Sequence, residues 1–316
     1  MEKNIKIKII VLLIAMIMIS ACARSGTGTL TELYTGKQGV VVTMQNTDIF
    51  KNIIEGINLP VNIKVQNKGA YDVEDAKIKI IYDNKLFEAE DTLKSFNLEG
   101  KKQYNPEGYQ DIIEYNIQNT IIPSENKNSY IIAHTCYMYK TYAKTNICFG
   151  NPSSAGCDYK DYSSISLSNG QGAPVGISKI TETVVESRDS FDLILDIYVD
   201  NFGDGQTTMP DKYSALCTKD ITLTKEDKLN HVKLDVFTIS EDDIRTKLEF
   251  SCQNINSDNS VDLSKRHIIC TRKFEKEDYK SSYVTLLEIE LSYGYVQTTN
   301  EKLTFQDIQK DIWTQS

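Results

Sequence analysis

Cysteine is the residue type whose number and spacing bear most directly on chemistry in this chain. Cys22 follows an apolar N-terminal run, and the other six are Cys136, Cys148, Cys157, Cys217, Cys252 and Cys270. An even number of cysteines outside the cell is typical of disulfide bonding. No two are spaced as C-x-x-C and the chain has only 3 histidines, so the spacing does not favour zinc. The pattern predicts disulfides and no metal site.

Two of the pairings have a local rationale. Cys148 and Cys157 enclose a loop of Gly, Pro and Ser, which suits the staple of a hairpin. Cys252 and Cys270 suit a bond between neighbouring strands. The remaining two are Cys136 and Cys217. They are either free thiols or joined to each other between two domains, and only the even number of cysteines favours the bond.

The motifs of common catalytic sites are absent from the sequence. It has no G-x-S-x-G nucleophile motif, no phosphate-binding Gly-rich loop and no dinucleotide fingerprint. His134, His231 and His267 stand in strand-like or loop contexts without a companion motif, which predicts hydrogen-bonded structural histidines. We expect no catalytic residue, no cofactor and no enzymatic activity.

Acidic residues crowd two turns, at Asp200–Gly205 and Glu241–Asp243. Calcium needs several oxygens converging at about 2.3–2.6 Å, and the first turn lacks the spacing of an EF-hand loop. Asx turns explain Asp200, Asn201 and Asp204 equally well. The sequence leaves calcium binding at Asp200–Asp204 open.

The N-terminus has the pattern of a secretory signal. Three lysines precede an apolar run from Ile9 to Ala21, which is short for a membrane span of about 20 residues. The run ends Ile19-Ser20-Ala21-Cys22, which resembles a lipobox, the signature of secreted lipoproteins, in which the cysteine is lipidated. We predict lipidation at Cys22 and a location on the extracellular face of the membrane. The alternatives are a plain signal cleaved near Ala21 and an uncleaved anchor helix.

The charge of the chain bears on its partners. The formal net charge is −9 and becomes −11 without the signal, which carries three lysines and one glutamate. An acidic chain is a poor ligand for phosphates, so nucleic acid is not an expected partner. The partners we expect are the membrane, through the N-terminal lipid, and another surface protein.

The elements that must position these residues are strands. Apolar and polar residues alternate through Val61–Gln66 and again through Asp192–Val199, which is the period of a strand with one buried face. Both runs end in the same I-x-V-x-N-x-G pattern, at Ile63–Gly69 and Ile197–Gly203. Asn and Gly tolerate the left-handed backbone of a tight turn. We interpret the two copies as equivalent second strands of two related domains.

The chain of 316 residues is long enough for two domains of ordinary size. Short strands separated by turn signals predict an all-β protein of two tandem immunoglobulin-like antiparallel β-sandwiches. The clearest break is the Gly- and Pro-containing stretch at 166–174. The predicted segments are a signal peptide with lipobox at 1–22, a tether at 23–37, sandwiches at 38–171 and 172–297, and a tail at 298–316. Tyrosine-rich strands are expected at Ser129–Tyr142 and Tyr283–Tyr295.

The turn pattern of residues 61–72, V-x-I-x-V-x-N-x-G-A-x-D, resembles immunoglobulin-like modules of the CARDB type, which are common in archaeal and bacterial surface proteins. The stretches at 136–141, 170–175 and 291–295 resemble uncharacterised surface proteins of small-genome archaea. The resemblance implies a fold and a surface location. It carries over no catalytic residue.

These observations favour a lipid-anchored, non-enzymatic surface protein acting in binding, adhesion or envelope structure. One alternative is a secreted hydrolase or solute-binding component with a site between the domains. Another is a filament subunit in which a neighbour's Val40–Met44 completes an exposed sheet edge. Tyr137, Tyr139, Tyr142, Tyr293 and Tyr295 are the composition feature most typical of recognition, although tyrosine is also a good strand former.

Overall fold

A computed structural model describes residues 34–51, 53–121, 129–154, 156–162, 164–218, 229–239, 244–253, 255–256 and 259–305. The predicted signal peptide, Cys22 and most of the tether lie outside these residues, as do the acidic turn at Glu241–Asp243 and most of the tail. No helix in the described part of the chain is long and apolar enough to cross a membrane.

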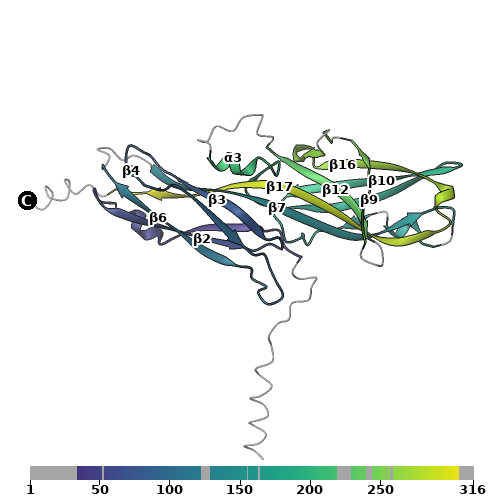
Figure 1. Cartoon of the computed structure of the whole chain (residues 1–316), viewed down its shortest axis with the longest axis horizontal. Helices are drawn as coiled ribbons and strands as arrows, with labels where there is room; N and C mark the ends of the chain where they lie inside the picture. The colour runs from purple at the N-terminus through teal and green to yellow at the C-terminus, as the bar shows by residue number, and fades with distance from the viewer. Residues whose placement is uncertain are drawn as a thin grey trace, which may run out of the picture.

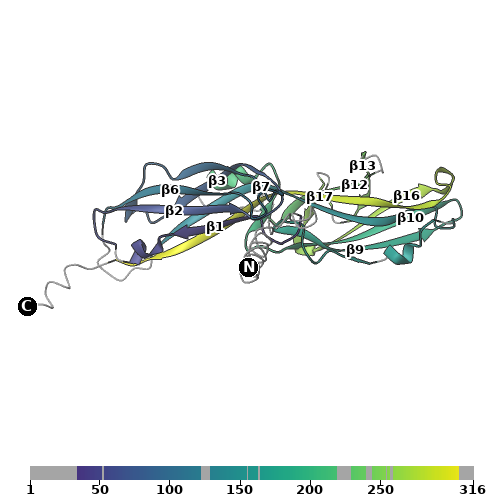
Figure 2. The same ribbon diagram turned by 90° about the horizontal axis from the view of Figure 1, so that it is seen from below.

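The fold is all-β, as predicted, and consists of antiparallel sheets. A long central sheet runs the length of the molecule, and a smaller sheet packs on its inner face at each end (Figures 1 and 2). The first small sheet has the order β1 (Val40–Gln45), β2 (Asn58–Asn67), β6 (Gln110–Asn119) and β4 (Phe87–Glu88). The second has the order β14 (Ser251–Cys252), β16 (His267–Glu275), β10 (Ser190–Asn201), β9 (Val175–Glu186) and β8 (Ile165–Ser166).

The central sheet is shared by both ends. Its order is β13 (Arg245–Lys247), β12 (His231–Ile239), β17 (Ser282–Leu303), β7 (Ser129–Gly150), β3 (Val73–Ile81) and β5 (Leu93–Leu98). Two short strands lie off this path: β11 (Gln206–Thr208) pairs with β17, and β15 (Ser260–Asp262) pairs with β12. Among the described residues, the helical segments are α3 (Tyr213–Thr218) and the 3₁₀ turns η2 (Thr47–Lys51), η3 (Tyr159–Tyr162), η5 (Leu263–Lys265) and η6 (Lys276–Asp278).

The strands β7 and β17 pair along their entire length of 22 residues each, from Ser282 opposite Gly150 to Leu303 opposite Ser129. Both strands therefore pass through both ends of the molecule, as Figure 1 shows. The β3 strand joins this pair at one end and β12 joins it at the other. Each end is completed by a strand from the other half of the chain.

The structure corrects four predicted limits. The strand expected at Ser129–Tyr142 continues to Gly150, and the one expected at Tyr283–Tyr295 continues to Leu303, into the predicted tail. Because both strands serve both ends, residues 171–172 do not divide two independently built sheets. The last part of the predicted tether is also fixed, since Gly36 N donates to Asn169 O at 2.8 Å and Gly172 N donates to Gly36 O at 2.9 Å.

The two halves are related by an approximate two-fold axis. The order of the central sheet is symmetric, with β7 and β17 in the middle, β3 and then β5 beyond β7, and β12 and then β13 beyond β17. The small sheets match in order as well, with β1 and β2 in the places of β9 and β10. In the antiparallel β7–β17 pair, the axis passes through Met138 opposite Gly294. The repeat seen in the sequence is an internal duplication of structure.

Candidate functional site

Four tyrosines occupy the centre of the molecule, on the inner face of the β7–β17 pair. Tyr139 lies opposite Tyr293 and Tyr137 opposite Tyr295. All four side chains are fully buried, and their ring centroids are 5.6–6.3 Å apart in successive contacts. Burial raises the pKa of each hydroxyl, to about 12 for Tyr295, so the hydroxyls stay protonated. These tyrosines form a core and not an exposed recognition surface.

The tyrosine hydroxyls anchor the two I-x-V-x-N-x-G turns in the same way. Tyr139 donates to Asn67 Oδ1 at 3.2 Å, and Tyr295 donates to Asn201 Oδ1 at 3.3 Å. Four residues beyond each asparagine, a backbone N–H donates to the same hydroxyl, from Tyr71 at 3.2 Å and from Gly205 at 2.9 Å. This shared geometry explains why both turns contain Asn followed two residues later by Gly.

The other two hydroxyls bind the first residues of β1 and β9 in the small sheets. Val40 N donates to the Tyr137 hydroxyl at 3.3 Å, and Val175 N donates to that of Tyr293 at 3.3 Å. The carbonyl groups of the same valines accept from Gln297 Nε2 at 2.9 Å and from Thr141 Oγ1 at 2.6 Å. Each small sheet is thereby fastened to the centre of the long sheet.

The halves differ at the free sides of β7 and β17. On β17, the short strand β11 pairs with Gly294–Val296, directly beyond the pairing with β12. On β7, pairing with β3 ends at Cys136, opposite Lys77. Beyond it β3 bulges at Asp75, whose φ is 51° and whose N–H donates to Asn97 Oδ1 at 2.7 Å. Among the described residues no strand pairs with this side of β7 from Met138 to Gly150.

A groove of about 1320 Å³ lies at this open edge. Its floor is the outer face of β7 from Met138 to Lys144, one wall is the loop at 166–171, and one end is the turn at 70–75. Four tyrosines line it, namely Tyr34, Tyr71, Tyr142 and Tyr213.

Gly294 and Met138, the two residues on the two-fold axis, show why the edge of β17 is covered and the edge of β7 is open. A Cβ atom on Gly294 would lie 2.6 Å from Tyr213 Cβ and 2.8 Å from Thr208 Cγ2, so the close cover by β11 and α3 requires glycine there. Met138 is half-buried and faces the groove in the corresponding place.

The charged side chains beside the groove are held in a network. Glu288 and Glu290 are 4% and 7% exposed, and Arg245 contacts both, at 2.7 Å and 2.6 Å. Lys140 lies 2.9 Å from Glu290, and Lys144 lies 3.0 Å from Glu288. Desolvation opposes the ionisation of Glu290, but hydrogen bonds from Arg245 and Lys140 outweigh it and lower its pKa. These ion pairs hold Lys140 and Lys144 in fixed positions on the groove floor.

The six cysteines form three disulfides, in the pairs that the sequence raised. Cys148 is joined to Cys157, Cys252 to Cys270, and Cys136 to Cys217. The last bond connects β7 to α3, which packs over the outer face of the long sheet through Leu216.

The three histidines lie in different surroundings. His231 Nδ1 lies 2.8 Å from Leu229 O, and His267 contacts Asp196. His134 is buried beside the Cys136–Cys217 disulfide, and desolvation lowers its pKa. A hydrogen bond with the backbone of Leu216 acts on this pKa in the opposite direction, so His134 is hydrogen-bonded as predicted, although its Nδ1 has no hydrogen-bond partner among the described residues.

The acidic turn after β10 is occupied by contacts within the protein. Asp200 Oδ1 accepts from Arg266 Nε at 2.6 Å. Asn201 Oδ1 accepts from Gly203 N at 3.2 Å, which is the Asx turn considered from the sequence, and Asn201 Nδ2 donates to Gly205 O at 2.8 Å. The Oδ1 atoms of Asp200 and Asn201 therefore bind groups of the protein itself.

One buried carboxyl was not anticipated. Glu182, on β9, is 3% exposed, and neither of its oxygens has a hydrogen-bond partner among the described residues. Desolvation raises its pKa to about 8, with the nearby backbone of Cys148 acting in the opposite direction. A glutamate at an alternating strand position gives no sequence signal of burial, because the charged residues Lys179 and Glu186 on the same strand are exposed.

Comparison with known proteins gives a weak likeness in structure and none in sequence. No family model matches the chain, and no curated protein matches it. Among solved structures, the chain is similar to the secreted serine protease VesC from Vibrio cholerae at 10% identity and a TM-score of 0.19. The match covers 85% of this chain and 52% of that one, so the chain spans about half the length of the structure it matches.

Proposed function

We propose that this chain is a non-enzymatic binding module of the cell surface, anchored by a lipid on Cys22, that holds an extended segment of another surface protein. In this proposal its two ends are immunoglobulin-like sandwiches in tandem, fused through β7 and β17. The observation that carries the proposal is the open edge of β7 beside the groove.

An open sheet edge favours an extended occupant. Unpaired backbone N–H and C=O groups along a strand bind another strand by β-augmentation, in which main-chain hydrogen bonds supply affinity. The fold itself contains the precedent, because β11 makes this addition at the two-fold-related edge of β17. Thr207 and Thr208 of β11 are fully buried there. We therefore expect an occupant with small or β-branched residues opposite Met138–Lys140.

Side chains of the groove define the rest of the occupant. Tyrosines provide large contact area with little conformational entropy to lose, which suits recognition of a peptide. The lysines of the floor are already paired with Glu288 and Glu290. Glu74 is exposed at the end of the groove. This arrangement favours a segment with a basic residue at the end nearest Glu74.

The filament alternative draws less support from the structure. Val40–Gln45 is β1 and pairs with β2 through all six of its residues. Donating Val40–Met44 to a neighbour would require that ladder to open. The alternative of a hydrolase or solute-binding site between the domains also draws less support. The four buried tyrosines fill the centre of the molecule, so such a site has no space on the inner face of the long sheet.

The test is photocross-linking on the native envelope. A photoreactive amino acid replaces Met138 in the groove or, as the matched control, Val284, which is exposed on the same face of the central sheet outside the groove. We expect Met138 to cross-link to one segment of a surface protein and Val284 not to. Equal labelling at both positions, or labelling at Met138 only by residues of the chain's own N-terminus, would count against a partner protein.

A companion experiment tests the anchor separately. Replacing Cys22 with serine should release the protein from the membrane fraction while leaving the purified protein's affinity for the captured segment unchanged. If the Cys22→Ser protein stays in the membrane fraction, the lipid anchor is wrong, while the proposed binding of a segment in the groove is unaffected.

A further inference from the structure

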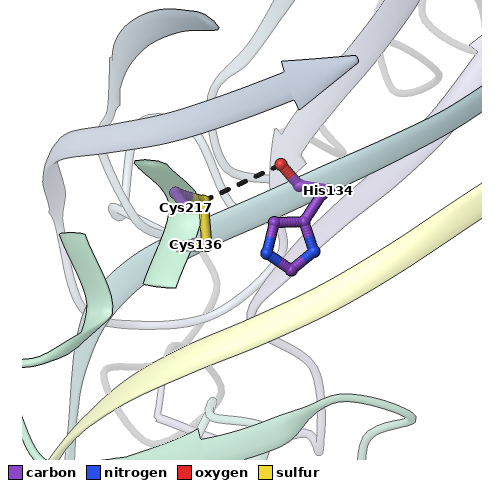
Figure 3. A group of neighbouring side chains, drawn as sticks. All are labelled: His134, Cys136 and Cys217. Carbon is purple, nitrogen blue, oxygen red and sulfur yellow. Dashed lines mark hydrogen bonds between the residues drawn. A yellow bond between two sulfur atoms is a disulfide. The ribbon is translucent and has the colours of Figure 1, made fainter. Parts of the chain in front are cut away.

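His134, Cys136 and Cys217 form a compact cluster under α3. His134 and Cys136 are two residues apart on β7 and so point to the same face of the sheet, and Cys217 reaches them from α3 (Figure 3). Their ligand atoms, one ring nitrogen and two sulfurs, all lie within 4.8 Å of one another. The three residues are 3%, 0% and 0% exposed.

One polar atom of the oxidised cluster lacks a partner, although the His134 ring has a hydrogen bond with the backbone of Leu216. The Nδ1 atom of His134 has no hydrogen-bond partner among the described residues, although a buried polar atom without a partner is costly. Cys217 Sγ lies 3.8 Å from His134 O, but a disulfide sulfur has no proton to donate, so this contact satisfies neither group. The hydrogen bond with Leu216 and the disulfide leave the buried Nδ1 atom of His134 unpartnered.

We propose that reduction of the Cys136–Cys217 disulfide creates a three-ligand site for a thiophilic d¹⁰ metal ion, Zn²⁺ or Cu⁺. A dithiol reductant supplies two electrons and two protons, breaks the S–S bond and is itself oxidised to a disulfide. The two new thiols then lose their protons to solvent as the metal–sulfur bonds form. Imidazole and two thiolates are ligands that these ions prefer, and a three-ligand set leaves one position for water or an exogenous donor.

The surroundings of the cluster suit the charge of a bound metal ion and the displacement of Cys217 that binding requires. Two thiolates balance a divalent ion, and Lys79 lies close enough to His134 to offset the residual negative charge around a monovalent one. Two sulfurs on one zinc ion stand about 3.8 Å apart when each bond is about 2.3 Å and tetrahedral. Cys217 must therefore move away from Cys136. It sits on α3, a single short helix of 6 residues, whereas Cys136 is fixed within the sheet.

The test uses the full chain with Cys148, Cys157, Cys252 and Cys270 replaced by serine, so that only one disulfide can be reduced. The protein is treated with a phosphine reductant under anaerobic conditions and titrated with Co²⁺, then with Zn²⁺ against a chromophoric chelator, and with Cu⁺ in a separate arm. We expect one equivalent bound, with thiolate-to-cobalt charge-transfer absorption, in the reduced form and none in the oxidised form. The His134→Ala variant should bind at least about tenfold more weakly.

If the four-serine chain fails to fold, the fully reduced natural chain is compared with its Cys136→Ser/Cys217→Ser variant, which keeps the other four thiols. The proposal requires one equivalent more in the natural chain, and the His134→Ala change must weaken it. Equal stoichiometry in these two proteins, or an affinity indifferent to His134, would overturn the site.

Discussion

The Tyr139 hydroxyl donates to Asn67 Oδ1 at 3.2 Å, which fastens the turn after β2 to the centre of the long sheet. Asn67 is fully buried, and its Nδ2 donates to Tyr71 O at 2.7 Å and to Leu98 O at 3.3 Å. The related bond between Tyr295 and Asn201 lies at an exposed turn. One sequence motif therefore holds two structurally equivalent turns in different solvent environments.

Replacing the two asparagines should have unequal effects. The Asn67→Ala change leaves buried partners unsatisfied and should lower the free energy of unfolding by about 1–3 kcal/mol for each group left unpaired. Asn201→Ala should cost less, because water reaches its partners. Urea unfolding of both variants measures the difference. Equal losses would show that solvent exposure does not distinguish the two turns.

The glycines of the two turns should respond differently to removal of a hydroxyl. A Cβ atom on Gly203 would collide with the Tyr295 hydroxyl, while the next two atoms, Tyr295 Cζ and Pro174 Cβ, lie at 3.2 Å and 3.3 Å. We expect Gly203→Ala to destabilise the protein and Tyr295→Phe to relieve much of that loss in the double variant.

Gly69 serves as the matched comparison. A Cβ atom there would collide with the Tyr139 hydroxyl and would also lie 2.5 Å from Gly172 O and 2.7 Å from Gln38 O. Because backbone atoms cannot be removed, Tyr139→Phe should not rescue Gly69→Ala. Rescue at both positions would mean that the hydroxyls alone set the spacing.

Much of the fold could be predicted from residue patterns, because a buried face on a strand leaves a period of two in the sequence. The two copies of I-x-V-x-N-x-G marked β2 and β10 for this reason. The far end of β17 was missed because Gln297–Lys302 are polar on both faces. The same holds for β7 near Lys144 and Asn146.

The groove could not be predicted, because it depends on pairing between distant segments. Nothing local to Ser129–Gly150 shows that it pairs with Ser282–Leu303. The bulge at Asp75, which ends the pairing with β3, lies in an ordinary Val-Glu-Asp-Ala stretch. Cysteine parity pointed to Cys136 and Cys217, but no local signal placed His134 beside them.

The three disulfides should contribute unequally to stability. Their sequence separations are 81 for Cys136–Cys217, 18 for Cys252–Cys270 and 9 for Cys148–Cys157. Loop-closure entropy assigns about 4.5, 3.2 and 2.6 kcal/mol to loops of these lengths. Thermal unfolding of the three double-serine variants should rank in this order. A larger loss for the Cys148–Cys157 variant would show that native packing around the disulfide outweighs chain entropy.

Glu182 should make stability fall as the pH rises. Its pKa in the folded protein is raised from the ordinary 4.5 to about 8, so the folded state binds more protons than the unfolded state between these values. The contribution of Glu182 is fully favourable below about pH 4.5 and is lost as the pH passes 8. Melting temperatures between pH 5 and pH 9 should therefore fall less steeply for Glu182→Gln. Parallel curves for the two proteins would exclude burial of an ionisable group there.

The most direct measurement of the central claim is amide hydrogen exchange of β7, without and with the captured segment. In the free protein, the groove-facing amides of Met138–Lys144 should exchange much faster than those of Gly294–Val296, which β11 covers. Adding the segment should slow the groove-facing amides by at least about tenfold and leave Gly294–Val296 unchanged. Slow exchange at Met138–Lys144 in the free protein, or no change when the segment binds, would contradict strand capture at this edge.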